Sequence, residues 1–291
     1  MMMIELNSAA LRRSIKAWLE EDIGTGDVTT MSTIPADGRS SAVIHMKESG
    51  IAAGLPVAEA IFHTVDPNLQ FRPQVEDGAN VDKGTVIAEV EGSTRSILLG
   101  ERLALNILQR MSGIATRTRQ FADAVKGLPV RLVDTRKTTP GHRMLEKYAV
   151  RVGGGHNHRF GLYDAVLIKD NHIKGAGGLA AAVERARSQI PHTMKIEVEV
   201  ETDSQVEEAL TSGVDIILLD NMSVDRMRAA VTRIKSQAAH IIVEASGSVR
   251  LETIRAIAET GVDVIAVGRL TYSVSSLDIS LDLFGKKRVM S

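Results

Sequence analysis

The sequence lacks cysteine, is poor in aromatic residues and contains no long apolar run. Its 291 residues include no Cys, which excludes disulfide bonds, thiolate metal sites, iron–sulfur clusters and a cysteine nucleophile. Aromatic residues make up 3%, too few for the stacking platforms that bind single-stranded nucleic acid. No uncharged stretch approaches the roughly 18 residues of a membrane span, and the N-terminus lacks a signal peptide's apolar core. We therefore expect a cytoplasmic protein.

Neither sign of charge is in excess over the whole chain. There are 35 Lys and Arg residues against 36 Asp and Glu, and the formal net charge is −1. Proteins that bind nucleic acid or membrane surfaces usually carry a basic excess, so we expect neither partner. Hydrophobic residues make up 44%, enough for a sizeable core, and the length suggests one large or two medium domains.

The first hundred residues predict a small α/β domain. Ile15, Trp18 and Leu19 follow a helical spacing that suits an opening amphipathic helix. Short β-like runs at Ser41–Met46 and Val86–Val90 follow, separated by Gly and Pro.

One segment of this domain is similar to half of a lipoyl or biotinyl carrier domain. It covers residues 75–92, and Lys83 would be the modified lysine on an exposed hairpin. A lysine beside a turn glycine more often has only a structural role. A non-enzymatic carrier module nevertheless remains an alternative function.

From residue 129 onward, short apolar runs alternate with amphipathic segments of helical length. The runs are Val130–Val133, Ala165–Ile168, Ile196–Val200, Ile216–Leu219, Ile241–Val243 and Val264–Val267. The helical segments are Thr94–Lys126 before them, then Leu179–Gln189, Ser204–Thr211, Val224–Lys235 and Val249–Glu259. This alternation indicates βαβ units and a parallel sheet. Six repeats fall short of the eight in a closed barrel of ~250 residues, so we expect an incomplete α/β barrel.

The residues that follow the first two runs are strongly basic. Between Asp134 and Lys174 there are eight basic residues, four acidic residues and four of the eight histidines. The basic residues are Arg136, Lys137, Arg143, Lys147, Arg151, Arg159, Lys169 and Lys174. A solvated basic face is one interpretation, but these residues occupy loops and strand ends, which favours a small anionic ligand. His156 and His158 could be two metal ligands, although the adjacent glycines and Arg159 suit zinc poorly.

The later strand ends carry carboxylates and then glycine-led loops. Alternating glutamates over Glu197–Glu201 share a face, which is costly unless they meet cations, hydroxyls or solvent. A structural salt bridge remains open for Glu197, and Asp220 closes the next strand. Ser246–Ser248 and Gly268–Arg269 end the last two strands, where backbone N–H groups bind phosphate in many barrels.

Together these strand ends predict a ligand with carboxylates or diphosphate, ribose-like hydroxyls and a terminal phosphate. The sequence contains neither a P-loop nor a GxGxxG fingerprint, which removes the main support for kinase-like and Rossmann chemistry.

Motifs along nearly the whole chain occur in the same order as in a known family. They are Glu21–Thr29, Glu101–Asn106, Ser112–Thr116, Asp134–Gly141, Gly153–Leu162, Ile168–His172, Glu197–Glu201, Leu219–Asn221, Glu244–Ser248 and Val267–Gly268. In these motifs the sequence resembles the quinolinate phosphoribosyltransferases. The resemblance implies conversion of quinolinate and phosphoribosyl diphosphate to nicotinate mononucleotide, diphosphate and CO2, with Mg2+, in de novo NAD biosynthesis.

The resemblance also implies the architecture. An N-terminal α/β sandwich-like domain would cover residues 1–112, and an open, about seven-stranded α/β barrel, the phosphoribosyltransferase domain, would cover residues 113–269. Residues 270–291 would pack back on the N-terminal domain. One barrel strand is then missing from the six apolar runs. The family forms homo-oligomers, dimers at least, in which the residue matching Arg102 reaches the neighbouring site.

The family's functional residues map onto particular positions of this sequence. Lys137, Glu199 and Asp220 match catalytic residues that lie near both substrates, the ribose hydroxyls and the metal-bound diphosphate. Mg2+ is expected mainly through the diphosphate, with Glu199 and Asp220 as candidate ligands. Arg136, His158, Arg159 and Lys169 match the positions that hold the quinolinate carboxylates. The other substrate-binding positions match Thr135, Ser246, Gly247, Ser248, Val267, Gly268 and Arg269.

A molybdenum-transport-associated paralogue of the same fold is the alternative within this group of proteins. That paralogue loses much of the basic pocket for a dicarboxylate. This sequence keeps the four cations of the pocket, Arg136, Lys137, Arg159 and Lys169. The carrier hypothesis likewise leaves the strand-end charges unexplained.

Overall fold

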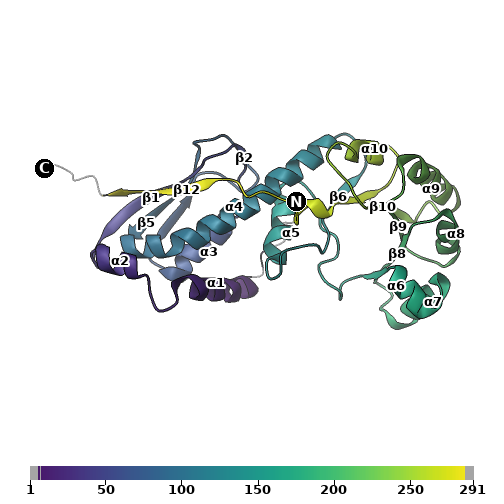
Figure 1. Cartoon of the computed structure of the whole chain (residues 1–291), viewed down its shortest axis with the longest axis horizontal. Coiled ribbons are helices and arrows are strands. Elements are labelled where there is room, and N and C mark those ends of the chain that lie inside the picture. The colour runs from purple at the N-terminus through teal and green to yellow at the C-terminus, as the bar shows by residue number, and fades with distance from the viewer. Residues whose placement is uncertain (1–5, 7, 286–291) are drawn as a thin grey trace. The chain divides into compact units, whose positions relative to one another are not determined.

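The computed structural model describes residue 6 and residues 8–285 (Figure 1). They form two compact units. The first contains the described residues up to Arg119, residues 139–154 and those from Val274 onward, and the second contains residues 120–138 and 155–273. The domain boundary expected at residues 112/113 remains a prediction. No helix in the described part of the chain has the length and apolar character to cross a membrane.

A four-stranded antiparallel sheet forms the centre of the first unit. Its order is β12-β1-β5-β3, with bounds Ile279–Gly285, Arg39–Met46, Val86–Ser93 and Gln70–Pro73. Alternate residues of β1 are buried, from Ser40 to Met46, as expected for a strand with one face on a core. β12 pairs with β1 from Ser40 opposite Gly285 to Met46 opposite Ile279, so the C-terminal part of the chain completes this sheet.

Four helices, and a fifth, α4, as far as Arg119, belong to the described part of the first unit. They are α1 (Ser8–Ile23), α2 (Val28–Thr33), α3 (Leu55–Val65), α4 (Thr94–Ala124) and α5 (Arg143–Val152). α1 buries Leu11, Ile15 and Leu19, which confirms the helix expected from this spacing. The half-buried Asp77 carboxylate accepts the N–H groups of Gly54 and Leu55 at 2.8 and 3.0 Å, and thereby satisfies donors at the start of α3.

The strands around Lys83 do not form the hairpin of a carrier domain. β4 (Asn80–Val81) pairs with β2 (Gly50–Ile51) in a separate two-stranded sheet, whereas β5 pairs with β1 and β3. Lys83 lies in a turn, and its backbone N–H donates to Ser49 Oγ at 3.1 Å. The carrier interpretation of this segment is therefore wrong.

A six-stranded parallel sheet forms the second unit and confirms all six apolar runs. Its order is β6-β11-β10-β9-β8-β7, with bounds Arg131–Val133, Val264–Ala266, Ile242–Ser246, Ile216–Asp220, Ile196–Val200 and Val166–Ile168. The described residues thus form six barrel strands rather than the about seven expected, and beyond β6 Val133 makes one isolated parallel bridge with His156. Together with the first sheet, this arrangement confirms the predicted α/β class.

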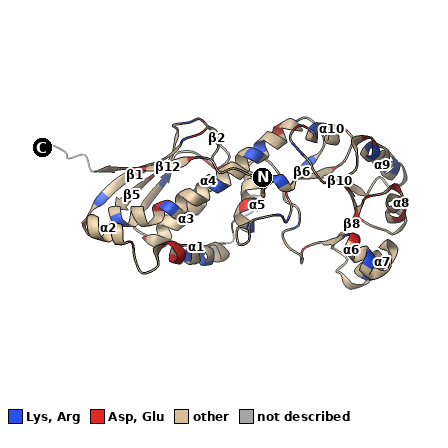
Figure 2. Cartoon of the chain, in the orientation of Figure 1, with Lys and Arg blue, Asp and Glu red and all other residues tan. Residues whose placement is uncertain are grey.

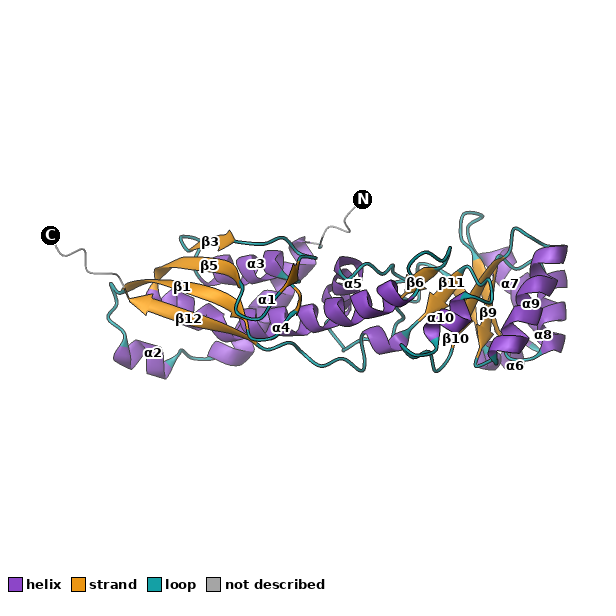
Figure 3. Ribbon diagram, turned by 90° about the horizontal axis from the view of Figure 1, so that it is seen from above, coloured by secondary structure: helices purple, strands orange, loops and turns teal. Residues whose placement is uncertain are grey.

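Five helices connect these strands. They are α6 (Asp170–Ala176), α7 (Leu179–Gln189), α8 (Asp203–Thr211), α9 (Val224–Gln237) and α10 (Ile254–Ala258). Figure 3 shows α7, α8 and α9 beside one another along the sheet. α10 is shorter than the helix expected over Val249–Glu259, because turns occupy residues 251–253. Both signs of charge are spread over the helices of both units, in keeping with the neutral total (Figure 2).

Candidate active site

A cavity of about 590 Å³ lies at the carboxyl ends of the parallel strands of the second unit. Each of the six strands places at least one lining residue at or just after its end: Arg136, Lys169, Glu199, Asp220, Ser246 and Arg269. The cavity therefore occupies the edge at which barrel enzymes hold their substrates.

Twelve of the site residues expected from the sequence line this cavity. They are Thr135, Arg136, Lys137, His158, Arg159, Lys169, Glu199, Asp220, Ser246, Gly247, Ser248 and Arg269. Gly268 lies beside it, since an added Cβ would meet the Tyr272 ring at 2.8 Å and Lys137 Cδ at 3.1 Å. Val267 is buried after β11, and Arg102 lies exposed on α4 of the other unit.

Seven lining residues were not expected from the sequence. They are Leu167, Leu218, Asn221, Glu244, Arg250, Ala266 and Tyr272. Asn221 and Glu244 belong to motifs that the sequence shares with the family, and these motifs could have indicated that both residues line the cavity. Leu167, Leu218 and Ala266 are apolar strand residues whose contribution to a cavity wall depends on the pairing of distant strands.

Two guanidinium groups face the same cavity. Arg136 follows β6 and Arg159 follows the bridge at His156. Burial lowers the pKa of Arg159, and the nearby charge of Arg136 lowers it further. Arg159 Nη1 donates to the Ala165 carbonyl at 2.9 Å, which fixes the guanidinium. Two like charges held together in this way favour a ligand with two negative groups.

The glutamates of β8 meet cations. Glu199 accepts a hydrogen bond from the Lys169 ammonium. Glu197 is 3% exposed, and its Oε2 lies 3.2 Å from His158 Nε2. Glu201 lies beyond the end of the strand and is exposed. Cationic partners for Glu197 and Glu199 thus offset the expected cost of burying alternating carboxylates. The salt bridge considered for Glu197 is the one to His158.

His158 is enclosed by carboxylates. Its Nε2 also lies 3.4 Å from Glu244 Oε1, and Glu244 is 3% exposed. Burial alone would lower the pKa of His158, but hydrogen bonds and charge from Glu197 and Glu244 outweigh it and raise the pKa to about 10. Burial raises the pKa of Glu244. Both shifts mean that this cluster retains a proton at neutral pH.

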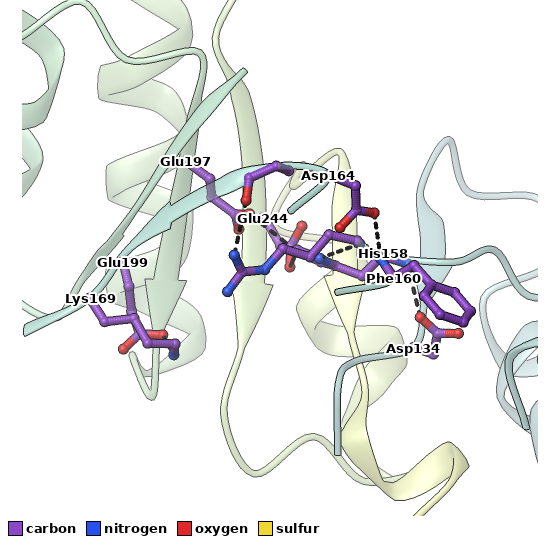
Figure 4. A network of polar contacts seen from close by, with 10 residues as sticks. Asp134, His158, Phe160, Asp164, Lys169, Glu197, Glu199 and Glu244 are labelled. Atoms are coloured by element: carbon purple, nitrogen blue, oxygen red, sulfur yellow. Dashed lines mark hydrogen bonds and ion pairs between the residues drawn. The ribbon is translucent and has the colours of Figure 1, made fainter. Parts of the chain in front are cut away.

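A buried aspartate holds the segment that carries His158. Asp134 is 0% exposed, and its carboxylate accepts from Asn157 Nδ2 at 2.6 Å and from the His158 N–H at 2.9 Å. Asp164 accepts the N–H groups of Phe160 and Gly161 at 2.6 and 2.9 Å. Figure 4 shows His158 between Asp134 on one side and the glutamates Glu197 and Glu244 on the other.

The loops after β9 and β10 pack closely. Gly247 has a φ of +91°, and an added Cβ would lie 2.3 Å from Asn221 Oδ1. Asn221 itself has a φ of 52°, and its Nδ2 donates to Asp220 Oδ2 at 2.7 Å. Only glycine fits position 247 without strain, and the resulting turn exposes backbone to the cavity. After β11, a short 3-10 turn covers Gly268–Leu270.

Two comparisons with family models agree with this arrangement. The quinolinate phosphoribosyl transferase C-terminal domain matches residues 114–282, and the N-terminal domain of the same family matches residues 27–112. The chain belongs to the quinolinate phosphoribosyltransferase family.

The similarity to curated members of the quinolinate phosphoribosyltransferase family extends over nearly all of the chain. A probable nicotinate-nucleotide pyrophosphorylase (carboxylating) of Bacillus subtilis is 46% identical over 278 residues, covering 96% of this chain and 95% of the relative. The chloroplastic nicotinate-nucleotide pyrophosphorylase (carboxylating) of Arabidopsis thaliana is 45% identical, covering 94% and 82%. The solved nicotinate-nucleotide pyrophosphorylase of Francisella tularensis superposes with a TM-score of 0.91 at 37% identity, covering 98% and 99%.

Proposed function

We propose that the chain transfers the phosphoribosyl group of phosphoribosyl diphosphate to quinolinate, with decarboxylation to nicotinate mononucleotide, and so serves de novo NAD biosynthesis. The observation that carries this proposal is the composition of the cavity, whose lining combines the cations Arg136, Arg159 and Lys169 with strand-end carboxylates and a glycine-led loop. The names of the relatives support it, since they are nicotinate-nucleotide pyrophosphorylases or quinolinate phosphoribosyltransferases.

The basic end of the cavity would bind the pyridine dicarboxylate. Arg136 and Arg159 offer planar forks that suit two carboxylates, and Lys169 adds a third cation. His158, which also lines the cavity, would complete this end as the fourth residue expected to hold the quinolinate carboxylates. The three cations and Lys137 are the four residues that separate the proposed function from that of the molybdenum-associated paralogue.

The other end would bind phosphoribosyl diphosphate. Glu199 and Asp220 would meet the ribose hydroxyls, and the loops at Ser246–Ser248 and Gly268–Arg269 would take the 5′-phosphate. Carboxylate oxygens are the protein ligands that Mg2+ prefers, so the donor set of the cavity fits this ion. Bound Mg2+ would neutralise charge on the diphosphate, with Glu199 and Asp220 as its candidate protein ligands.

The reaction needs an electrostatic environment rather than a nucleophile of the protein. The pyridine nitrogen forms a bond to the anomeric carbon while the bond from that carbon to the diphosphate oxygen breaks. Glu199 and Asp220 would stabilise the positive charge that develops on the ribose, and Lys137 the negative charge of the departing diphosphate. The ribosylated ring nitrogen then accepts the electron pair left by CO2, and a proton takes the place of the lost carboxylate.

A homodimer or larger assembly belongs to the proposal. Arg102 would enter the site of a neighbouring copy, which gives this exposed α4 residue a function. The cytoplasm remains our prediction for the location of the protein.

Product formation tests the proposal directly. The purified full chain is incubated with quinolinate, phosphoribosyl diphosphate and Mg2+, and nicotinate mononucleotide is identified by chromatography and mass. Omission of any one component is expected to abolish product. Absence of product with all three present, from protein that is folded, would contradict the proposal.

A further inference from the structure

Two arginines line the cavity from neighbouring loops of the second unit. Arg250 follows β10, which ends at Ser246, and Arg269 follows β11. These strands are adjacent in the parallel sheet, and their register pairs Ala245 with Ile265. The two loops therefore leave the sheet side by side. Arg250 has none of the substrate roles assigned above.

The backbone of Arg250 is held in place by the turn that precedes α10. Its N–H donates to Thr253 Oγ1 at 3.1 Å. Its carbonyl accepts the N–H groups of Thr253 and Ile254 at 3.1 and 2.9 Å. Val249, directly before it, is buried, whereas Arg250 is exposed. The side chain therefore extends from an anchored point of the chain to the cavity that it lines.

The charge of these two arginines is not compensated by an acidic neighbour. Within the described ranges of the chain, neither Arg250 nor Arg269 forms an ion pair with a carboxylate. Lys169 differs from them, because its ammonium already donates to Glu199. Two guanidinium groups without a carboxylate partner in one cavity are available to an anionic ligand.

The neighbouring loop favours a phosphate group as that ligand. Gly247 and Ser248 are two consecutive residues with positive φ, at 91° and 52°, and both line the cavity. Backbone N–H groups in such turns attract anions through partial charges only. A phosphate monoester carries about −1.5 to −2 charges at neutral pH. Guanidinium groups supply full positive charge and paired donors that match phosphate oxygens.

We propose that Arg250 is a substrate-binding residue that determines specificity for a phosphorylated ribosyl donor. Together with Arg269 it binds the terminal 5′-phosphate of phosphoribosyl diphosphate above the loop at Ser246–Ser248. Lys137 remains the cation for the diphosphate at the other end of the same substrate. This assignment rests on the proposed function and adds a residue to its phosphate end.

The test compares charge-removing and charge-keeping variants of the full chain. Arg250→Gln and Arg269→Gln remove a guanidinium, and Arg250→Lys keeps the charge without the planar fork. Arg228→Gln is the matched control, because it removes the same charge from an exposed ion pair with Asp225 on α9. Calorimetry measures the Kd of ribose 5-phosphate and of quinolinate, and steady-state kinetics gives kcat and the KM of phosphoribosyl diphosphate.

Arg250→Gln is expected to raise the Kd of ribose 5-phosphate and the KM of phosphoribosyl diphosphate by at least about tenfold. The kcat should stay within about threefold of wild type, because the 5′-phosphate contact is made equally before and during the reaction. The Kd of quinolinate should stay within about twofold, because a different set of cations binds it. Arg250→Lys should lose less, the double variant of Arg250 and Arg269 should lose more, and Arg228→Gln should match wild type.

Three results would overturn the inference. An unchanged KM in Arg250→Gln would make Arg250 a solvated surface residue. A raised KM with an unchanged Kd of ribose 5-phosphate would move its contact to the diphosphate. Equal losses for quinolinate and ribose 5-phosphate would indicate a general effect of charge on the cavity. Where ribose 5-phosphate binds too weakly for calorimetry, its inhibition constant against phosphoribosyl diphosphate replaces the Kd.

Failure of this inference and failure of the proposed function give different results. Wild-type protein that converts quinolinate while Arg250→Gln shows one of these three results refutes the role of Arg250 alone. Wild-type protein that does not convert quinolinate, but binds ribose 5-phosphate in a manner that depends on Arg250, refutes the proposed function and retains the phosphate site. Protein that neither converts quinolinate nor binds ribose 5-phosphate refutes both.

Discussion

The Lys169 ammonium donates a hydrogen bond to the Glu199 carboxylate across two neighbouring strands. The parallel register places Ile168 opposite Val198, so the next residues of the two strands, Lys169 and Glu199, emerge side by side at the cavity. In the proposed complex Lys169 belongs to the quinolinate end and Glu199 to the ribose end. The pair thus marks the boundary at which the two substrates meet.

Glu199→Ala is expected to lower kcat/KM by at least about a hundredfold, because it removes a charge that stabilises the developing ribosyl cation. Lys137→Ala should cause a loss of similar size at the leaving group. Neither variant should unfold, since both side chains face the cavity. Glu207→Ala, which removes an exposed ion pair with Arg233, is the control and should retain wild-type kinetics. Near wild-type rates in Glu199→Ala or Lys137→Ala would remove that residue from the mechanism.

Gly247→Ala should impair the phosphate end of the cavity. The new Cβ would lie 2.3 Å from Asn221 Oδ1, and the φ of +91° is strained for any residue with a side chain. We expect a raised KM for phosphoribosyl diphosphate and a lower Tm. Gly175→Ala is the matched control for this substitution, because nothing lies within 4 Å of its added Cβ. Equal kinetic constants for the two variants would contradict this role of the loop.

The stability of the protein should depend on pH through His158. Its pKa is raised to about 10, so its contribution is fully present below the unfolded value near 6.5 and is lost progressively as the pH rises toward 10. The difference in Tm between wild type and His158→Gln should therefore shrink from pH 6 to pH 10. Ser204→Ala, an exposed position of the same unit without a titratable group, is the control and should show no such trend. A constant difference for His158→Gln would show that the imidazole is not held in its charged form by Glu197 and Glu244.

Arg102 tests the proposed assembly. Arg102→Ala and Lys169→Ala protomers should each be inactive or nearly so as homo-oligomers. Mixed assemblies should regain activity, because one site in a mixed dimer would contain both intact residues. Co-expression with two affinity tags isolates the mixed species. Mixed dimers of confirmed composition that remain as inactive as the parents would contradict action of Arg102 in a neighbouring site.

The strands and most helices of the second unit could be predicted from the sequence because local patterns determine them. Ile216–Leu219 is wholly apolar and ends at Asp220, and the observed strand β9 covers Ile216–Asp220. The residue types that usually mark the start of a helix are less reliable. Thr139 and Pro140 suit the N-cap and first turn of a helix, yet α5 begins at Arg143, after His142. The Thr139 N–H instead donates to the buried Glu146 carboxylate at 3.2 Å, a contact within the fold that overrides the local signal.

The pairing of distant strands could not be predicted in the same way. β4 and β5 are neighbours in the sequence and have the turn of a hairpin between them, but they belong to different sheets. The contacts of Glu244 within the site could not be predicted for the same reason. It ends an apolar run like other strand-end acids, and only the order of strands reveals that it meets His158 together with Glu197.

The most direct test of the proposed function is a comparison of kcat/KM for quinolinate and for nicotinate, measured with phosphoribosyl diphosphate and Mg2+ under the same conditions. We expect efficient turnover of quinolinate, with one CO2 and one diphosphate released per nicotinate mononucleotide. Nicotinate should be used poorly, because it leaves one of the two guanidinium groups without a carboxylate. Turnover of nicotinate without turnover of quinolinate would contradict the proposed function.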